Sequence, residues 1–194
     1  MPRRSLAIAA VTLVLATGPA FAGIGIFSDP SGSDCNLTLP LGVPTQIYVL
    51  YLGEGGPMAN GAEYRIAGMP GRFGVDYYAQ QTHAPGSNLN LGNAFDGAGH
   101  NVAWPAAQPF DSNGNLLLAT YTLVSLTAPV PAATILEVTH RNPPFDPFFQ
   151  CPLITDARYS LLCQSGGKMR VNGGPRCSVA VEQRTWTEVR NLYR

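Results

Sequence analysis

Along this chain, short stretches of hydrophobic residues, some of them alternating with polar positions at a period of two, are separated by Gly, Pro, Asn, Asp and Ser. This period places successive side chains on opposite faces of a strand, so each stretch predicts a β-strand. The strongest stretches are residues 45–52, which are β-branched and aromatic, and residues 116–126, a long apolar and Thr-rich run expected at the centre of a sheet. The predicted strands are residues 23–27, 45–52, 62–67, 73–79, 101–104, 116–126, 134–139, 159–163, 168–171 and 178–181.

The stretch at residues 62–67 shows the alternation most clearly. Tyr64 and Ile66 fall on one side, and Glu63 and Arg65 fall on the other. This pattern is typical of a half-buried strand whose charged side faces water.

Turn residues predict how some of these strands connect. Gln-Ser-Gly-Gly at residues 164–167 predicts a hairpin between strands 159–163 and 168–171. Pro105 is expected to end the short strand before it. Residues 141–152 contain four prolines and three phenylalanines, which predicts a long ordered loop. Short strands at this spacing, with almost no helical periodicity, predict an all-β, two-sheet β-sandwich of roughly eight to ten strands.

One short helix is predicted at the end of the chain, over residues 185–194. Its first residues, Thr-Trp-Thr-Glu, fit a capping box. Its apolar side chains, Trp186, Val189, Leu192 and Tyr193, would share one face. That face is expected either to pack on the sandwich as a C-terminal plug or to act as a recognition tag.

The first 22 residues have the pattern of a secretory signal peptide. Arg3 and Arg4 precede an apolar run at residues 6–16, and Ala-Phe-Ala at residues 20–22 provides small residues before a cleavage point. The run has about 11 residues, which is too short to span a membrane. We therefore predict an exported protein, periplasmic, cell-surface or extracellular, without a membrane span after signal removal.

The remainder is expected to form one sandwich domain, residues 23–184, followed by the helical tail at residues 185–194. The full chain of 194 residues carries 12 basic and 12 acidic residues, and only 12% of its residues are charged, against roughly 25% in typical domains. Because no basic patch appears, nucleic acid is not an expected partner.

All four cysteines follow the predicted signal peptide, and an even number in an oxidising compartment predicts two disulfides. Three pairings are open. We favour Cys151–Cys163 as a local clasp, with Cys35–Cys177 joining the first strands to the last.

Patterns that would carry catalysis or bind a metal are weak. The three histidines, His83, His100 and His140, are scattered along the sequence and have no metal-ligand spacing. The stretch Asp-Ser-Asn-Gly-Asn at residues 111–115 resembles a calcium loop, but its glycine is at the wrong position for the helix-loop-helix motif. A tight turn is the stronger interpretation of this stretch. No nucleophile motif such as Gly-x-Ser-x-Gly occurs. We predict neither an enzyme nor a cofactor or metal site.

Aromatic residues offer one candidate ligand site. Tyr77, Tyr78 and Trp104, with Tyr51, could stack on sugar rings, although packing in the core is the stronger interpretation for Trp104. A model of the fold distinguishes these alternatives by showing which rings are buried.

Two stretches resemble cohesin-type sandwiches. Residues 45–66, which end in Gly-Ala-Glu-Tyr-Arg-Ile, resemble their first strands, and residues 115–123 are similar to a later Gly-x-Leu-Ala-x-(apolar) strand. The resemblance implies a cohesin-like or immunoglobulin-like sandwich. Because the cysteines and the Pro/Phe loop depart from this family, a dockerin-binding role is not carried over.

The whole chain resembles a set of uncharacterised exported proteins of environmental bacteria. It shares their Ser-Asp-Pro-x-Gly start followed by Cys, their Cys-Pro-Leu segment and their Trp-x-x-Val-x-x-Leu-Tyr tail. The sequence therefore predicts a non-catalytic exported module with a structural, adhesive or protein–protein role, its partner being a protein or polysaccharide at the cell surface. The alternative is a carbohydrate-binding module that uses exposed aromatics.

Overall fold

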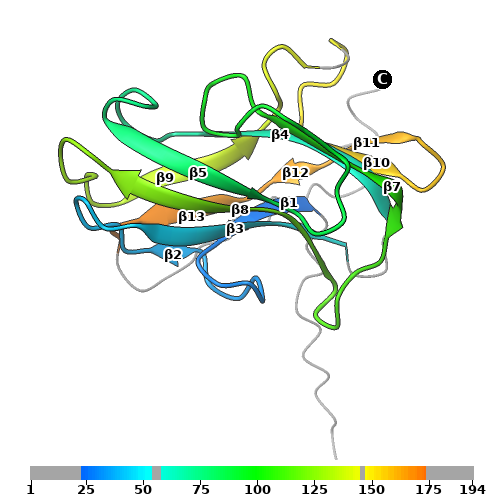
Figure 1. The fold of residues 1–194 in the computed structure, drawn as a ribbon, viewed down its shortest axis with the longest axis horizontal. Coiled ribbons are helices and arrows are strands. Elements are labelled where there is room, and N and C mark those ends of the chain that lie inside the picture. Colours follow the sequence, from blue (N-terminus) through cyan, green and yellow to red (C-terminus); the bar gives the residue numbers. More distant parts are fainter. Residues whose placement is uncertain (1–22, 54–57, 145–146, 174–194) are drawn as a thin grey trace, which may run out of the picture.

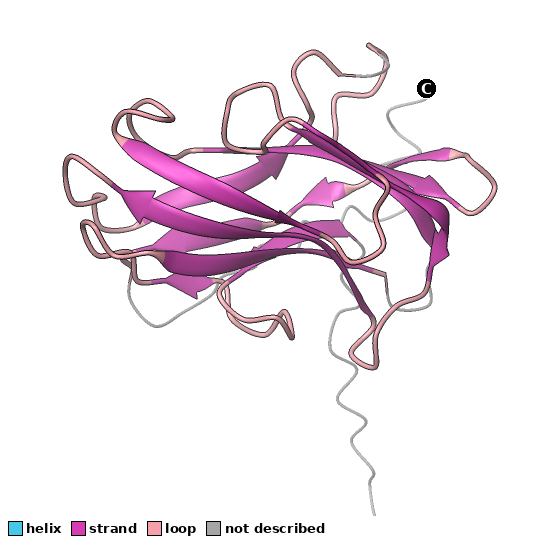
Figure 2. Cartoon of the chain, viewed as in Figure 1, coloured by secondary structure: helices cyan, strands magenta, loops and turns pink. Residues whose placement is uncertain are grey.

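The computed structural model describes residues 23–53, 58–144 and 147–173, and all regular structure within these ranges is β-strand (Figure 2). The strands are β1 (Gly23–Phe27), β2 (Asn36–Leu37), β3 (Thr45–Leu52), β4 (Ala59–Ala67), β5 (Tyr77–His83), β6 (Leu89–Leu91), β7 (His100–Gln108), β8 (Asn115–Ser125), β9 (Thr134–Thr139), β10 (Leu153–Asp156), β11 (Leu161–Cys163), β12 (Ser165–Gly166) and β13 (Lys168–Val171). The all-β prediction is confirmed for these residues. The predicted signal peptide, the strand at 178–181 and the helix at 185–194 lie outside them.

Two sheets pack face to face as a sandwich (Figure 1). The five-stranded sheet has the order β12-β1-β3-β8-β5, and β8 lies inside it, as predicted for the long apolar run. The eight-stranded sheet contains the path β11-β10-β4-β9-β13-β2, with β7 paired to β4 and to β6. Most pairs are antiparallel, but β1–β12 and β2–β13 are parallel. The described strands number thirteen rather than eight to ten, because several have only two or three residues.

The core lies between the sheets. Ile26, Val49 and Tyr121 from the five-stranded sheet belong to one buried cluster with Tyr64 and Leu136 from the eight-stranded sheet. No described helix has the length and hydropathy needed to cross a membrane.

The predicted strand at residues 73–79 is shifted in the structure, where β5 runs from Tyr77 to His83. Residues 72–76 instead form a tight turn. Gly74 has a φ of 78°, and the Asp76 carboxylate accepts a 2.8 Å hydrogen bond from the backbone N–H of Arg72. A positive φ is incompatible with regular strand geometry, so pairing with β8 begins only after this turn.

The prediction that Pro105 ends a strand is also wrong. β7 continues to Gln108, and the register of its pairing with β4 shifts between Ala59 and Gly61. Proline lacks an N–H group, and the irregular pairing around Pro105 removes the need for one.

The predicted hairpin at residues 159–171 does not form. β11 pairs with β10, whereas β13 pairs with β9 and β2. Between them, β12 crosses to the other sheet and pairs with β1. The turn residues 164–167 therefore carry the chain between sheets. Gly166 allows this passage, since a Cβ there would lie 1.8 Å from the backbone oxygen of Val138.

Candidate binding surface

The strand register defines which side chains share the outer face of the eight-stranded sheet. Tyr64, Val102 and Ile154 are buried in the core, so their neighbours along β4, β7 and β10 point outward. Two outward rows cross the strands β11-β10-β4-β7-β6. The first row is Leu161, Thr155, Gly61, Ala103 and Leu89, and the second is Cys163, Leu153, Glu63, Asn101 and Leu91. We call these two rows the apolar half of the outer face.

A pocket of about 400 Å³ lies over the apolar half, lined by members of both rows together with Asn60, Trp104 and Tyr159. Gly61 and Ala103 leave space because neither has a long side chain, and Leu153 and Leu161 add apolar walls. Its volume falls in the range of roughly 300–1,000 Å³ that is typical of ligand pockets. The surface can therefore receive a large apolar group.

Two polar side chains are buried at this pocket. Glu63 is only 5% exposed and Asn60 is 6% exposed. Glu63 is the single charged residue among the described residues of the lining. The sequence placed Glu63 correctly on the face opposite Tyr64, but its burial corrects the expectation that this side faces water.

The rest of the outer face carries charged and polar side chains, although Ile135 is also exposed there. Lys168 Nζ lies 3.4 Å from Glu137 Oε1, and Arg65 Nε donates a hydrogen bond of 3.3 Å to Thr139 Oγ1. These residues come from β13, β9 and the end of β4. The ion pair and the arginine therefore lie on one half of the face, whereas the exposed leucines lie on the other.

Several apolar side chains in and around the apolar half are exposed. Leu89 and Leu91 are 40% and 52% exposed, and Tyr159 at the pocket is 74% exposed. Met58 is 47% exposed and lies beside the β10–β11 turn, because its backbone oxygen accepts a hydrogen bond from the N–H of Ala157. Large apolar groups so exposed are typical of surfaces that meet a partner.

The aromatic residues predicted to face a ligand differ in their exposure in the structure. Tyr51 and Tyr77 are 2% and 7% exposed, and Trp104 is 5% exposed with its indole N–H donated to the Pro85 oxygen. Tyr78 is 46% exposed, and its ring stacks on that of Phe73. The ligand-facing role of these residues stays a prediction, with Tyr78 the exposed ring and Trp104 at the pocket wall.

A closed ring of hydrogen bonds joins the two sheets in the core. The Tyr121 hydroxyl donates to Gln81 Oε1, and the Gln81 amide nitrogen lies 2.7 Å from His100 Nε2. His100 Nδ1 lies 3.0 Å from the Tyr64 hydroxyl, which lies 3.4 Å from that of Tyr121. Because an amide NH₂ group only donates, His100 Nε2 must accept the hydrogen bond from Gln81. Every contact in the ring then has one donor and one acceptor if His100 Nδ1 donates to the Tyr64 hydroxyl and the Tyr64 hydroxyl donates to that of Tyr121. The second Gln81 N–H faces His83 Nδ1 at 3.2 Å.

This ring requires a neutral imidazole at His100. The pKa of His100 is lowered from 6.5 to about 4, mainly by burial and also by the nearby His83, while Asp96 opposes the shift. Burial likewise raises the pKa of the Tyr64 and Tyr121 hydroxyl groups, so both stay protonated. The ring is thus a satisfied polar network that fixes the two sheets relative to each other.

The other candidate loop is a turn, as predicted. Asp111 Oδ1 accepts hydrogen bonds of 2.8 Å from the backbone N–H groups of Asn113 and Asn115, just before β8. Among the described residues, no group of three or more His, Cys, Asp or Glu side chains is placed to hold a metal ion.

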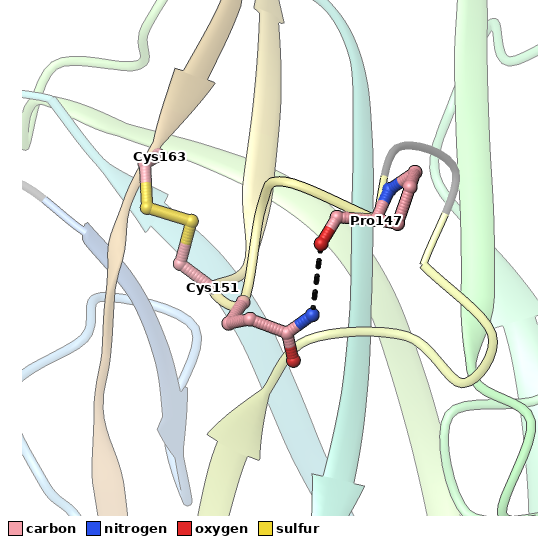
Figure 3. Close-up of a disulfide and its surroundings, with 4 residues drawn as sticks. Pro147, Cys151 and Cys163 are labelled. Atoms are coloured by element: carbon pink, nitrogen blue, oxygen red, sulfur yellow. Dashed lines mark hydrogen bonds between the residues drawn. A yellow bond between two sulfur atoms is a disulfide. The ribbon is translucent and has the colours of Figure 1, made fainter.

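The favoured Cys151–Cys163 disulfide is present (Figure 3). It links the end of the Pro/Phe loop to β11 at the edge of the sheet, and beside it the Gln150 amide donates to the Pro147 oxygen at 3.1 Å. Cys35 is also disulfide-bonded. Its predicted pairing with Cys177 stays a prediction, because Cys177 lies outside the described residues.

Sequence reasoning did not single out the apolar half. Its members come from five strands, and Gly61 and Ala103 are too small to attract attention alone. One signal in the sequence could have indicated it. In residues 101–104, Asn101 and Ala103 alternate with two large apolar residues, which places Asn101 and Ala103 together on the other face of the strand.

No protein-family model matches the sequence, and no curated protein matches it. Solved structures with a similar fold include the cohesin module of a family 33 glycoside hydrolase from Clostridium perfringens, which is 9% identical with a TM-score of 0.40 over 80% of this chain and 99% of that chain. A non-cellulosomal cohesin from the archaeon Archaeoglobus fulgidus is 14% identical with a TM-score of 0.44 over 78% of this chain and 91% of that chain. A chain of a type I cohesin–dockerin complex from Clostridium thermocellum is 6% identical with a TM-score of 0.42, over 81% and 98%. These three structural neighbours are cohesin modules, and the likeness to them concerns the fold alone.

Proposed function

We propose that this protein is a non-catalytic exported module that binds another protein through the apolar half of its outer face. The observation that carries this proposal is the pocket over Gly61 and Ala103, surrounded by exposed apolar side chains. Protein interfaces use such apolar centres, with pockets that accept aromatic or aliphatic anchors.

The chemistry of the pocket favours a protein over a sugar as the ligand. Most of its exposed lining is apolar, because Leu153, Leu161 and Ala103 outweigh its polar side chains, whereas sugar sites use many hydrogen-bonding groups around their aromatic platforms. Asn60 Oδ1 is buried without a hydrogen bond. A partner side chain with an apolar body and a donor group would match this lining.

Export is part of the same proposal. The signal-like pattern of residues 1–22 supports it, and so does the Cys151–Cys163 disulfide, since such bonds persist in oxidising compartments.

Partner capture tests the proposal. Purified protein should retain a partner from the exported proteins of its source, and Ala103→Glu should abolish that retention by placing a charge in the pocket. Ile135→Glu is the matched control, because Ile135 is a 40%-exposed strand residue outside the pocket lining. Equal retention by both variants would remove the apolar half as the binding surface.

Carbohydrate binding is the second candidate, and Tyr78 is the observation that favours it. Its ring is 46% exposed and stacks on Phe73, with ring centroids 5.8 Å apart. A glycan array tests this candidate: saturable binding that Tyr78→Ala abolishes would favour it over protein binding.

A further inference from the structure

Two arginine side chains lie against each other on the outer face of the eight-stranded sheet. Arg65 points outward from β4, because its neighbours Tyr64 and Ile66 are buried in the core. Arg141 follows β9, and a Cβ placed at Gly99 would lie 3.2 Å from Arg65 Cβ and 3.0 Å from Arg141 Cγ. The two side chains therefore meet over Gly99, and both are half-buried.

Neither arginine is paired with an acid in the described part of the chain, where the ion pairs involve other residues. Arg65 donates only to neutral oxygens, to Thr139 Oγ1 at 3.3 Å and to the Gly97 oxygen at 3.4 Å. The Arg141 guanidinium makes no hydrogen bond to the described residues, and its Nε is buried without one. A half-buried charge without a partner costs free energy, so these two groups are suited to an anionic ligand.

The surrounding surface carries an excess of positive charge. Among the outward side chains of β4, β9 and β13, Lys168 and Arg170 are two further cations. The acids there are Glu63 and Glu137, and Glu137 already pairs with Lys168. The Asp96 carboxylate, in the adjoining loop, accepts three backbone N–H groups instead. An anion is therefore attracted to this part of the face.

We propose that Arg65 and Arg141 bind a carboxylate group of a partner protein. Guanidinium groups form paired hydrogen bonds to the two oxygens of a carboxylate, and these charge-assisted bonds are stronger than neutral ones. Arg141 offers all of its N–H donors, and Arg65 keeps those of Nη2. The partner would present an Asp or Glu side chain here, because carboxylates are the common anionic groups of protein surfaces.

The carboxylate site adjoins the pocket of the apolar half. Glu63 lines that pocket, and Arg65 is the next outward residue of β4, about 7 Å further along the strand. One partner can thus place an apolar anchor over Gly61 and an acidic side chain on the two arginines. The choice of a protein as the partner rests on the proposed function, but the carboxylate site itself does not use the pocket.

Nuclear magnetic resonance of the arginine Nε–Hε groups tests this inference on the full chain. The probe is a hexaglutamate peptide, and a neutral Gly-Ser hexapeptide is its control. We expect hexaglutamate to shift the Arg65 and Arg141 signals in a saturable way and the neutral peptide to leave them in place. Arg141→Gln should weaken hexaglutamate binding, followed on the Arg65 signal, about tenfold. Arg158→Gln is the matched control, because Arg158 is an exposed arginine of the β10–β11 turn, and it should leave the binding unchanged.

Four results would overturn the inference. The first is an equal shift with the neutral peptide, and the second is binding that Arg141→Gln leaves unchanged. The third is tighter binding of hexagalacturonate or inorganic phosphate than of hexaglutamate, which would make the ligand a sugar acid or a phosphate. The fourth is an Arg141 signal that moves in the Asp146→Asn variant, which would mean that an acid of the chain itself fills the site.

Stability separates a binding role from a structural one. Arg141→Leu removes an unpaired half-buried charge, so we expect the urea midpoint to stay the same or rise while hexaglutamate binding is lost. A lower midpoint would make Arg141 a structural residue and would also overturn the inference. If hexaglutamate does not bind but Ala103→Glu abolishes partner capture, this inference fails and the proposed function stands. Hexaglutamate binding without partner capture removes the proposed function alone.

Discussion

Protonation of His100 should open the buried hydrogen-bonded ring and destabilise the protein in mild acid. The neutral imidazole accepts from Gln81 at Nε2 and donates to Tyr64 at Nδ1. A second proton on Nε2 would face the Gln81 amide N–H groups, so the amide would have to rotate. Rotation would break the bonds of Gln81 to Tyr121 and to His83.

The magnitude follows from the pKa of His100, which is about 4 in the folded protein against 6.5 for an ordinary histidine. Between these values the unfolded chain binds a proton and the folded protein does not. The stabilisation is therefore full above about pH 6.5 and is lost as pH falls towards 4, with a slope of up to about 1.4 kcal/mol per pH unit. From pH 7 to pH 5 the free energy of unfolding should fall by about 2 kcal/mol.

Urea unfolding measured at intervals between pH 7 and pH 5 provides the assay. Asp29 and Asp76 contribute little to the pH dependence of stability in this window. Their pKa values in the folded protein lie below the ordinary value of 3.8, so both carboxylates stay ionised between pH 7 and pH 5. His100→Gln should flatten the slope, whereas His140→Gln, which removes a histidine outside the ring, should keep it. A free energy of unfolding that stays within about 0.5 kcal/mol for the unmodified protein between pH 7 and pH 5 would refute the reasoning.

The remaining predictions concern the backbone and the disulfides. Gly166→Ala should destabilise the protein by more than about 3 kcal/mol in urea unfolding, because its Cβ would meet the oxygen of Val138 at 1.8 Å. Gly86→Ala is the control, because Gly86 has a φ of 72° and open space around it, and it should lower the free energy of unfolding by only about 1 kcal/mol. Equal destabilisation by the two variants would contradict the steric argument. Replacing Cys151 and Cys163 together by Ser should cost about 3 kcal/mol, since their bond closes a short loop, and an unchanged urea midpoint would count against a structural role. Thiol labelling of the unfolded, unreduced protein should detect no reactive thiol.

Strands whose formation depends on local pattern were predictable from the sequence. The bounds of β3 and β9 agree with the predicted ranges 45–52 and 134–139, because alternating β-branched residues favour one register strongly. In β9 the alternation also gives the correct faces, with Leu136 and Val138 buried and Glu137 outward.

Features that depend on distant parts of the chain were not predictable. The hairpin at residues 159–171 looked local, but β13 finds its partners at β9 and β2 instead of at β11. The same holds for the ring around His100, whose four members come from four different strands. Each of them is unremarkable alone, and only the pairing of the sheets brings their polar atoms together.

The placement of β12 and β13, the last strands of the described chain, governs when this sandwich can close. β12 completes the edge at β1, the first strand, and β13 fills the position between β2 and β9. A chain that is still being synthesised therefore carries open edges on both layers until residues 165–171 have emerged. Open edges are sites where strands of other chains can pair, and long-range pairing is slow. The chain thus keeps these edges open over most of its length, which makes the interval before residues 165–171 pair its main period of exposure to aggregation.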